Sequence, residues 1–138
     1  MGLEIGMIKD PLHWQQWPIA RAYLDPALSQ SDEDWASVEN DLNSNEMQLW
    51  AVLEGGEKKL LAAAVTRIAQ TNSGEVAEIY LCGGANHRDW AVDLASTIAS
   101  SSREIGCRSV RIFGRLGWKK ILESLGFKPN LMIYELVL

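Results

Sequence analysis

The sequence predicts a single α/β domain of the α+β type, with a mixed, mostly antiparallel sheet flanked by about four helices. Three observations carry this prediction: helical periodicity in the first third of the chain, three apolar runs separated by turn residues in the middle, and a strand–helix–strand passage near the end. A length of 138 residues is enough to bury one hydrophobic core. We therefore treat residues 1–138 as one domain.

Two helices are expected before residue 45. Asp10-Pro11 resembles a helix start, because aspartate caps a first turn and proline is tolerated at the first helical position. This helix is expected to run from Leu12 to about Leu24 and to end at Asp25-Pro26, since the residue before a proline avoids helical angles. A second helix is expected after Ser31–Asp34, whose side chains can accept hydrogen bonds from its first amides.

The middle of the chain predicts a three-stranded antiparallel meander. Its strands are expected at Leu49–Leu53, Leu60–Ile68 and Val76–Cys82. Glycine-containing turns at residues 54–57 and 71–74 separate them. Both turns are short, which favours antiparallel pairing of successive strands.

The last third of the chain alternates helices and strands. The elements are expected in the order Arg88–Ile105 (helix), Val110–Phe113 (strand), Trp118–Leu125 (helix) and Met132–Leu138 (strand). Gly106 is expected to end the first of these helices in a left-handed conformation. The strand–helix–strand passage implies that Val76–Cys82 and Val110–Phe113 are parallel neighbours joined by a right-handed crossover.

Composition excludes several functional classes. The net charge is −5, which disfavours generic nucleic-acid binding and leaves it as a weak alternative. Residues 1–57 hold eleven acidic and two basic side chains, whereas residues 58–138 hold seven acidic and eleven basic ones. No apolar run approaches the ~20 residues of a membrane helix, so no membrane partner is expected. Cys82, Cys107 and two histidines lack the spacing of a metal site and suit a reducing, cytoplasmic location.

The order of elements resembles that of the GNAT family of N-acetyltransferases over essentially the whole chain. Leu125-Gly126-Phe127, after a short helix, is similar to that family's closing segment. Trp50–Gly55 followed by Leu61–Val65 is similar to its central hairpin. The stretch Gly106–Trp118 also resembles small GNAT-like proteins encoded by tailed phages.

The resemblance implies a site for acetyl-CoA, whose pyrophosphate the family holds on backbone amides at a helix start. The corresponding stretch of this chain is Asn86–Ala91, in which Ala91 fits the last motif position and Arg88 could offset a negative charge. Gly83 and Gly84 are expected to form a turn, and the alternative is that they form a shifted phosphate loop. Asn86 stands where the family motif begins with Gln or Arg, and Asp89 stands where it has its first glycine. A carboxylate there crowds and repels phosphates, so Asp89 is interpreted as a helix cap.

The resemblance also implies a catalytic base and acid. The family often places the base on the strand before the loop, where this chain has Glu78. The alternative is that Glu78 pairs with a basic side chain on the sheet. Many members place a tyrosine acid just before the closing Gly-Phe, but this chain has Leu122, which donates no proton. Tyr134 is too far along the chain to replace it.

A basic segment is the remaining candidate, as a surface for a protein partner or an anion. Its residues are Arg111, Arg115, Trp118, Lys119 and Lys120. The alternative is that these charges pair with the acidic first half of the same chain.

The missing acid and the altered phosphate loop predict a non-catalytic GNAT-like protein, and the resemblance of Gly106–Trp118 to phage proteins implies one of phage type. Such a protein is expected to bind other virion proteins or a second copy of itself, as a virion or assembly component in a virion or the host cytoplasm, and to need no cofactor. The alternative is an N-acetyltransferase that uses acetyl-CoA, with Glu78 as its base.

Overall fold

The computed structural model describes residues 2–56, 58–113, 118–130 and 134–138. Two short 3-10 turns, Pro11–His13 and His87–Asp89, accompany the main elements. In chain order these elements are β1 (Leu3–Ile8), α1 (Trp17–Leu28), α2 (Trp35–Asn43), β2 (Met47–Glu54), β3 (Lys59–Thr71), β4 (Gly74–Gly84), α3 (Ala91–Glu104), β5 (Ser109–Ile112) and α4 (Lys119–Ser124).

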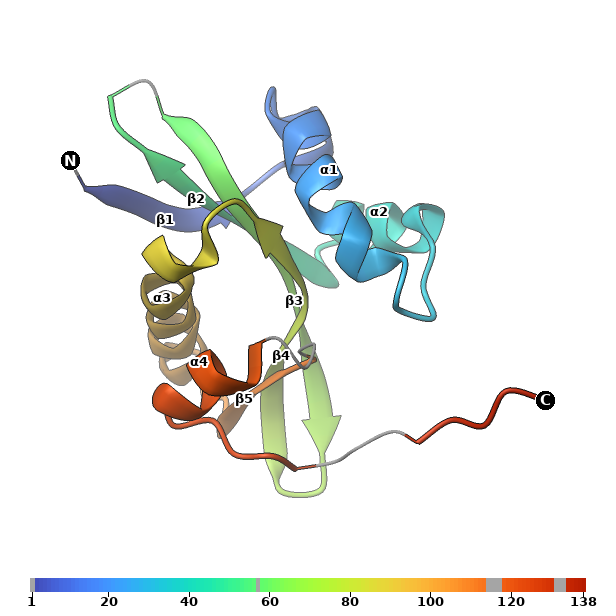
Figure 1. Ribbon diagram of the computed structural model, residues 1–138. Helices are drawn as coiled ribbons and strands as arrows, with labels where there is room; N and C mark the ends of the chain where they lie inside the picture. Colours follow the sequence, from blue (N-terminus) through green and yellow to red (C-terminus); the bar gives the residue numbers. More distant parts are fainter. Residues whose placement is uncertain (1, 57, 114–117, 131–133) are drawn as a thin grey trace.

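The five strands form one sheet in the order β1-β2-β3-β4-β5. The first four pair antiparallel, and β5 pairs with β4 in parallel, with Val76 opposite Ser109 and Ile79 opposite Ile112. Helix α3 connects β4 to β5. Helices α1 and α2 cover one face of the sheet, and α3 and α4 cover the other (Figure 1). The predicted fold class and the parallel β4–β5 pair are therefore confirmed.

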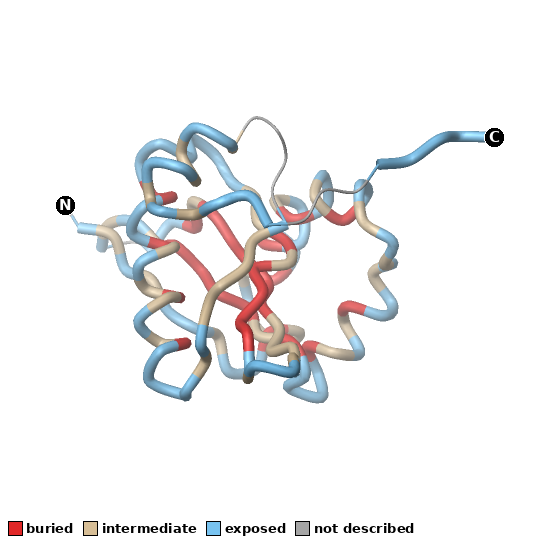
Figure 2. Tube along the Cα trace, turned by 90° about the horizontal axis from the view of Figure 1, so that it is seen from below, coloured by how far each residue is buried: buried red, intermediate tan, exposed pale blue. Residues whose placement is uncertain are grey.

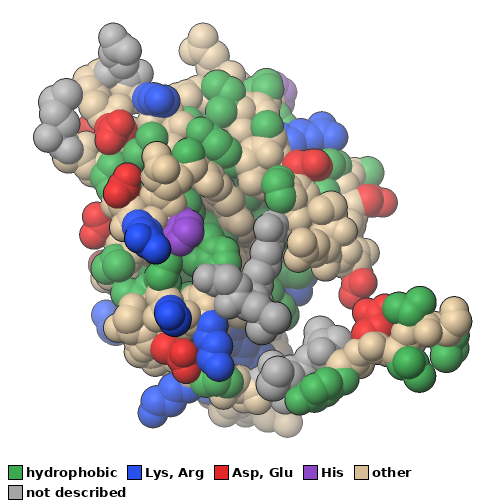
Figure 3. All heavy atoms as spheres, viewed as in Figure 1, with side chains coloured by type: hydrophobic (Ala, Val, Ile, Leu, Met, Phe, Trp, Pro, Cys, Tyr) green, Lys and Arg blue, Asp and Glu red, His purple; other side chains and the backbone are tan. Residues whose placement is uncertain are grey.

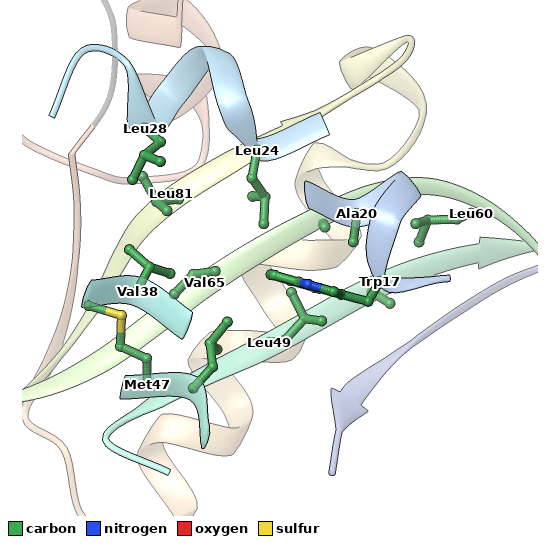
Figure 4. Packing of buried hydrophobic residues seen from close by; sticks show 13 residues of the cluster. Trp17, Ala20, Leu24, Leu28, Val38, Met47, Leu49, Leu60, Val65 and Leu81 are labelled. Atoms are coloured by element: carbon green, nitrogen blue, oxygen red, sulfur yellow. The ribbon is translucent and has the colours of Figure 1, made fainter. Parts of the chain in front are cut away.

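A hydrophobic core lies between the sheet and helices α1 and α2. Leu24 and Val38 point from the two helices toward Leu49, Val65 and Leu81 on three neighbouring strands (Figure 4). A second core lies between the other face of the sheet and α3. Its largest members are Trp50 and Trp90, which are 5% and 1% exposed. Buried residues follow the central strands, and exposed residues follow the outer helical surfaces (Figure 2).

Helix α1 differs from its prediction at both ends. Asp10-Pro11 opens only a 3-10 turn, and the α-helix begins at Trp17. The helix also continues through Pro26 to Leu28. Pro26 removes one hydrogen bond near the end of the helix. Leu28 is buried in the same core as Leu24, and this burial offsets the loss.

Helix α2 begins as the sequence predicts. The side chain of Asp34 accepts a 2.8 Å hydrogen bond from the amide of Ser37, which satisfies one donor of the first turn.

Helix α3 ends where the sequence predicts. Gly106 follows its last turn with φ of 93°, the left-handed conformation expected there.

The predicted final strand is wrong for the residues that the structure describes. Residues 134–138 form no strand, and they extend away from the body of the domain (Figures 1 and 2). Residues 131–133 of that prediction lie outside the described residues.

Candidate acyl-CoA site and sheet-face charge cluster

The pairing of β4 with β5 ends at Ile79 and Ile112, and we call the place beyond this last pair the gap. Among the residues that the structure describes, the hydrogen bond between these strands that lies nearest this end runs from the amide of Phe113 to the carbonyl of Ile79 at 3.2 Å. Strand β4 then continues to Gly84, whereas β5 has ended. In open α/β sheets, ligands bind outside the carboxyl ends of diverging strands. The gap is therefore the first place to look for a site.

A β-bulge lies beside this gap. Val65 of β3 is opposite Leu81, and Thr66 is opposite Ile79, so Tyr80 is an extra residue on β4. Bulges leave their extra residue out of the regular ladder and change the direction of the strand. The bulge places Tyr80 and Leu81 on the same face of the sheet, toward α1 and α2.

Aromatic side chains fill the gap on the α3 side. The rings of Trp90 and Trp118 lie with centroids 5.9 Å apart, and the His87 ring lies 5.0 Å from that of Trp118. The Nε1 of Trp90 donates a 2.6 Å hydrogen bond to the carbonyl of Ala85. The cavity among the described lining residues measures only about 20 Å³. That volume holds about one water molecule.

The glycine pair at the end of β4 has a packing explanation. A Cβ on Gly83 would overlap the carbonyl oxygen of Tyr23 in α1. A Cβ on Gly84 would lie 2.5 Å from the Cβ of Ala62 in β3. Both glycines therefore allow β4 to approach its neighbours closely. Nothing in the structure tests their predicted contact with a cofactor.

The start of α3 supplies amides and opposed charges. The first α-helical bond runs from the amide of Leu94 to the carbonyl of Trp90 at 2.9 Å, so the amides of residues 91–93 have no acceptor within the helix. The exposed Arg88 side chain lies in the preceding turn. Asp89 and Asp93 place two carboxylates at the same helix end.

The interpretation of Asp89 as a helix cap is wrong. The capping position of α3 is Trp90, and no side chain caps the helix there. Asp89 lies within the 3-10 turn and is exposed. The exposed Asn86 before that turn adopts φ of 52°, the left-handed conformation that asparagine tolerates.

Glu78 belongs to a charge cluster on the opposite face of the sheet. Its Oε1 accepts a 2.8 Å hydrogen bond from Nε of Arg67, and its Oε2 lies 4.0 Å from a guanidinium nitrogen of Arg111. Arg67 also lies 3.7 Å from Glu33. The guanidinium of Arg67 is stacked over the ring of Tyr80 at 4.0 Å. The predicted pairing of Glu78 with a basic side chain is confirmed.

The ion pairs of Glu78 prevent it from acting as a general base in the conformation that the structure shows. A general base needs a lone pair directed at the proton it removes. Both carboxylate oxygens of Glu78 face guanidinium groups, and its side chain is only 9% exposed. In this structure Glu78 is an ion-pair partner, two residues before the bulge at Tyr80.

The predicted acid position holds no proton donor. Leu122 lines the cavity at the gap together with Leu125 and Ile121. Tyr134 lies in the C-terminal segment and is 85% exposed. Among the described residues that line the cavity, the polar candidates are the Cys82 thiol and the Trp indoles. Burial raises the pKa of Cys82 to about 12, which makes it a weak acid.

The basic segment does not form one surface in the part of the chain that the structure describes. Arg111 lies on the α1–α2 side with Glu78, whereas α4 packs on the α3 side. Lys119 and Lys120 are exposed in the first turn of α4, where Lys and Arg side chains gather (Figure 3). Trp118 is half-buried against Trp90. Arg115 lies outside the described residues.

Sequence inspection missed Arg67 and Tyr80. Both lie in predicted strands, but only the pairing of β3 with β4 reveals their stacking and the bulge. A signal for Arg67 existed, because it is the one charged side chain between Lys59 and Thr71 of a mostly apolar strand.

A shallow, open patch lies on the outer face of α3, away from the gap. Its lining side chains are Ser96, Thr97, Ser100, Ser101 and Glu104. The described residues contain no group of three or more His, Cys, Asp or Glu side chains that could hold a metal ion. No helix within the described ranges is long and apolar enough to cross a membrane.

The fold of the chain is similar to that of solved acetyltransferase structures. An aminoglycoside acetyltransferase from an uncultured soil sample matches with a TM-score of 0.73 and 13% identity, over 100% of this chain and 99% of that one. A predicted acetyltransferase from Clostridium acetobutylicum, solved with acetyl-CoA, matches with a TM-score of 0.71 and 12% identity, over 99% and 96%. The fold is that of the GNAT acetyltransferases.

A third GNAT structure, an acetyltransferase from Trypanosoma brucei, matches with a TM-score of 0.66 and 15% identity, over 99% of this chain and 100% of that one. No protein-family model matches the sequence, and no curated protein matches it either. At these identities the GNAT neighbours show the fold of the chain, and its activity has to be argued from its own residues.

Proposed function

We propose that this chain is an N-acetyltransferase that uses acetyl-CoA. The observation that supports the proposal is the end of the β4–β5 pairing at Ile79 and Ile112, with the start of α3 beside the small cavity found there. The same fold occurs in GNAT acetyltransferases, one of them solved with acetyl-CoA. These neighbours favour the acetyltransferase alternative over the non-catalytic role that the sequence predicts.

The start of α3 supports binding of the pyrophosphate. Free amides at residues 91–93 and the positive end of the helix dipole favour an anion there, and Arg88 adds a positive charge. The negative charges of Asp89 and Asp93 repel a phosphate and therefore weaken anion binding at the same helix end. A like charge about 4 Å from a phosphate costs on the order of 1 kcal/mol in water. We therefore expect binding weaker than an unopposed helix end would give.

Acetyl transfer joins the acyl carbon to an amine nitrogen and releases CoA as its thiol. The amine has to lose a proton, and Glu78 is the carboxylate that precedes the bulge on β4. Because guanidinium groups occupy both of its oxygens, Glu78 can accept this proton only if Arg111, the more distant partner, moves away. The thiolate takes its proton from water, since Leu122 has none to donate.

Titration calorimetry with acetyl-CoA tests the proposal. We expect binding that weakens about tenfold, or ~1.4 kcal/mol, in Arg88→Glu. Arg103→Glu is the matched control, because Arg103 is exposed in the last turn of the same helix. Binding without transfer to any amine in a CoA-release assay would leave an acyl-CoA-binding protein. Absence of binding in the parent chain overturns the proposal.

A specific set of observations favours a second candidate, a non-catalytic protein that binds protein partners. The cavity at the gap is about 20 Å³, Glu78 is held in ion pairs, and Leu122 replaces the tyrosine acid. The virion or assembly role expected from the sequence belongs to this candidate. Lack of heat with acetyl-CoA, in a protein whose folding is verified by circular dichroism, supports it over the first.

A further inference from the structure

A pair of opposite charges lies next to the gap on the α1–α2 face of the sheet. Glu78 of β4 is opposite Arg111 of β5, one position before the pairing of the two strands ends. The Oε2 of Glu78 lies 4.0 Å from a guanidinium nitrogen of Arg111, whereas a charge-assisted hydrogen bond is about 2.7–2.9 Å long. The contact is therefore loose, and it is the one that has to open before Glu78 accepts a proton.

The two arginines around Glu78 differ in how fully their side chains are engaged. Arg67 donates a 2.8 Å hydrogen bond to Glu78, lies 3.7 Å from Glu33 and stacks on the ring of Tyr80. Among the described residues, the side chain of Arg111 has only its long contact with Glu78, and it is 36% exposed. Arg111 therefore has guanidinium donors available for an anion, and this group binds carboxylates in a planar, two-pronged geometry.

Two aromatic rings adjoin these charges. The rings of Tyr80 and Phe113 meet edge to face with centroids 5.6 Å apart, and the guanidinium of Arg67 lies 5.8 Å from the Phe113 ring. Phe113 follows Arg111 by two residues and is 51% exposed. Ligand sites combine apolar and aromatic walls with a few placed polar groups. This face of the sheet therefore suits a small molecule that carries both charges and an apolar part.

We propose that the acceptor amine is the α-amino group of an amino acid with an apolar side chain, an inference that rests on the proposed acetyltransferase function. Its carboxylate pairs with Arg111, its amino group meets Glu78, and its side chain packs against Phe113. Because the amino acid is a zwitterion, it replaces one 4.0 Å contact with two close ones and adds no net charge. A phosphate group brings more negative charge and is repelled more strongly by Glu33 and Glu78.

The acceptor opens its own base in this arrangement. Its carboxylate draws Arg111 away and frees Oε2 of Glu78, which takes one proton from the ammonium group. The nitrogen lone pair then forms the bond to the acyl carbon, and the C–S bond of acetyl-CoA breaks. The second nitrogen proton leaves to water, the thiolate takes a proton from water, and Glu78 returns its proton to solvent. An amine that has no carboxylate leaves Arg111 on Glu78 and reacts slowly.

A CoA-release assay with matched amines tests the substrate class. L-Phenylalanine and L-phenylalaninamide have the same ring and amino group, but only the first carries a carboxylate. We expect kcat/KM to be about tenfold higher for L-phenylalanine, the effect of one charge-assisted contact. Equal values for the two amines overturn the inference and leave the acetyltransferase proposal standing. Faster transfer to kanamycin, a polycationic amine, overturns it in the same way.

Arg111→Gln separates a substrate contact from a structural role. This variant should lower kcat/KM for L-phenylalanine about tenfold and raise it for L-phenylalaninamide, because Glu78 loses one of its two partners. A structural role lowers both values together, and that result overturns the inference. Arg103→Gln is the matched control, since Arg103 is exposed in the last turn of α3, and it should change neither value. Circular dichroism verifies that both variants are folded.

Calorimetry with L-phenylalanine in the absence of acetyl-CoA gives a readout besides activity. We expect heat of binding in the parent chain and its loss in Arg111→Gln. That result supports the amino-acid site even in a chain that fails to bind acetyl-CoA, a failure that overturns the acetyltransferase proposal alone. Absence of heat in the parent at millimolar L-phenylalanine, with and without acetyl-CoA, overturns the inference.

Discussion

The Nε of Arg67 donates a 2.8 Å hydrogen bond to Oε1 of Glu78, across neighbouring strands of the sheet. The Glu78 side chain is 9% exposed and that of Arg67 is 31% exposed. Because a buried carboxylate needs a partner, this contact governs both the stability of the sheet and the chemistry open to Glu78.

Replacing Arg67 with methionine should destabilise the fold. The change keeps much of the aliphatic volume but leaves Glu78 with Arg111 alone, 4.0 Å away. We expect the free energy of unfolding to fall by about 2–3 kcal/mol, near the lower end of the range for breaking a buried pair, because Arg67 is partly exposed. Urea denaturation measures the change.

Two further variants control this prediction. Lys58→Met removes an exposed pair with Glu4 and should cost less than ~1 kcal/mol. Arg67→Met/Glu78→Met removes both charges and should recover part of the loss. Equal urea midpoints for the parent and Arg67→Met would contradict an energetic role for the pair.

The position of this pair follows from the sequence more closely than the prediction recognised. The turn after β3 pairs Thr71 with Gly74, and a regular antiparallel ladder counted back from it places Arg67 opposite Glu78. The ladder keeps this register as far as Thr66 and Ile79. The bulge at Tyr80 interrupts it afterwards, and no residue type at that position signals a bulge.

Other parts of the site depend on tertiary contacts that no local pattern encodes. Trp118 meets His87 and Trp90 because α4 folds back over α3, and these residues are about thirty positions apart. The end of α1 also depends on tertiary contacts. The proline at position 26 predicted that the helix ends at Asp25, but it continues to Leu28, whose side chain is buried in the core. The strand order was predicted correctly because short turns and one crossover helix allow few sheet topologies.

Gly83→Ala should destabilise the domain. The new Cβ meets the carbonyl oxygen of Tyr23, a backbone atom that cannot move without shifting α1. Overpacking of this kind costs about 1–3 kcal/mol. Thermal denaturation of Gly83→Ala and of its control Gly6→Ala, a strand glycine with open space around its Cα, measures the difference. Unchanged stability with lost acetyl-CoA binding would instead assign Gly83 to the ligand.

The two cysteines should differ in reactivity. Burial raises the pKa of Cys82 from 9.0 to about 12, which lowers its thiolate fraction near neutral pH roughly a thousandfold. Partial burial and then the Glu75 carboxylate raise the pKa of Cys107 as well, but by less, and this thiol does not line the cavity among Trp90, Trp118 and Leu122 as Cys82 does. Ellman's reagent should therefore label one thiol in the native protein and two after unfolding.

Cys107→Ser identifies the reactive thiol, because this variant should show no rapid labelling in the native state. Raising the pH toward 9 should accelerate the labelling of Cys107, since more of its thiol is then ionised, and should leave Cys82 unlabelled. Two labels at similar rates in the native protein would mean that Cys82 is exposed by opening of the gap that it lines.

Trp118→Ala should have opposite effects on stability and on ligand binding. Removing the indole deletes its contacts with Trp90 and His87, and we expect the free energy of unfolding to fall by about 2 kcal/mol, less than for a fully buried tryptophan. The same change enlarges the cavity between β4 and β5. If acetyl-CoA enters that gap, the indole competes with it, and calorimetry should show tighter binding to the variant than to the parent.

Trp14→Ala is the control, because Trp14 is half-buried in the other core and should change stability without changing affinity. Weaker acetyl-CoA binding in Trp118→Ala would show that the indole contacts the ligand instead of excluding it.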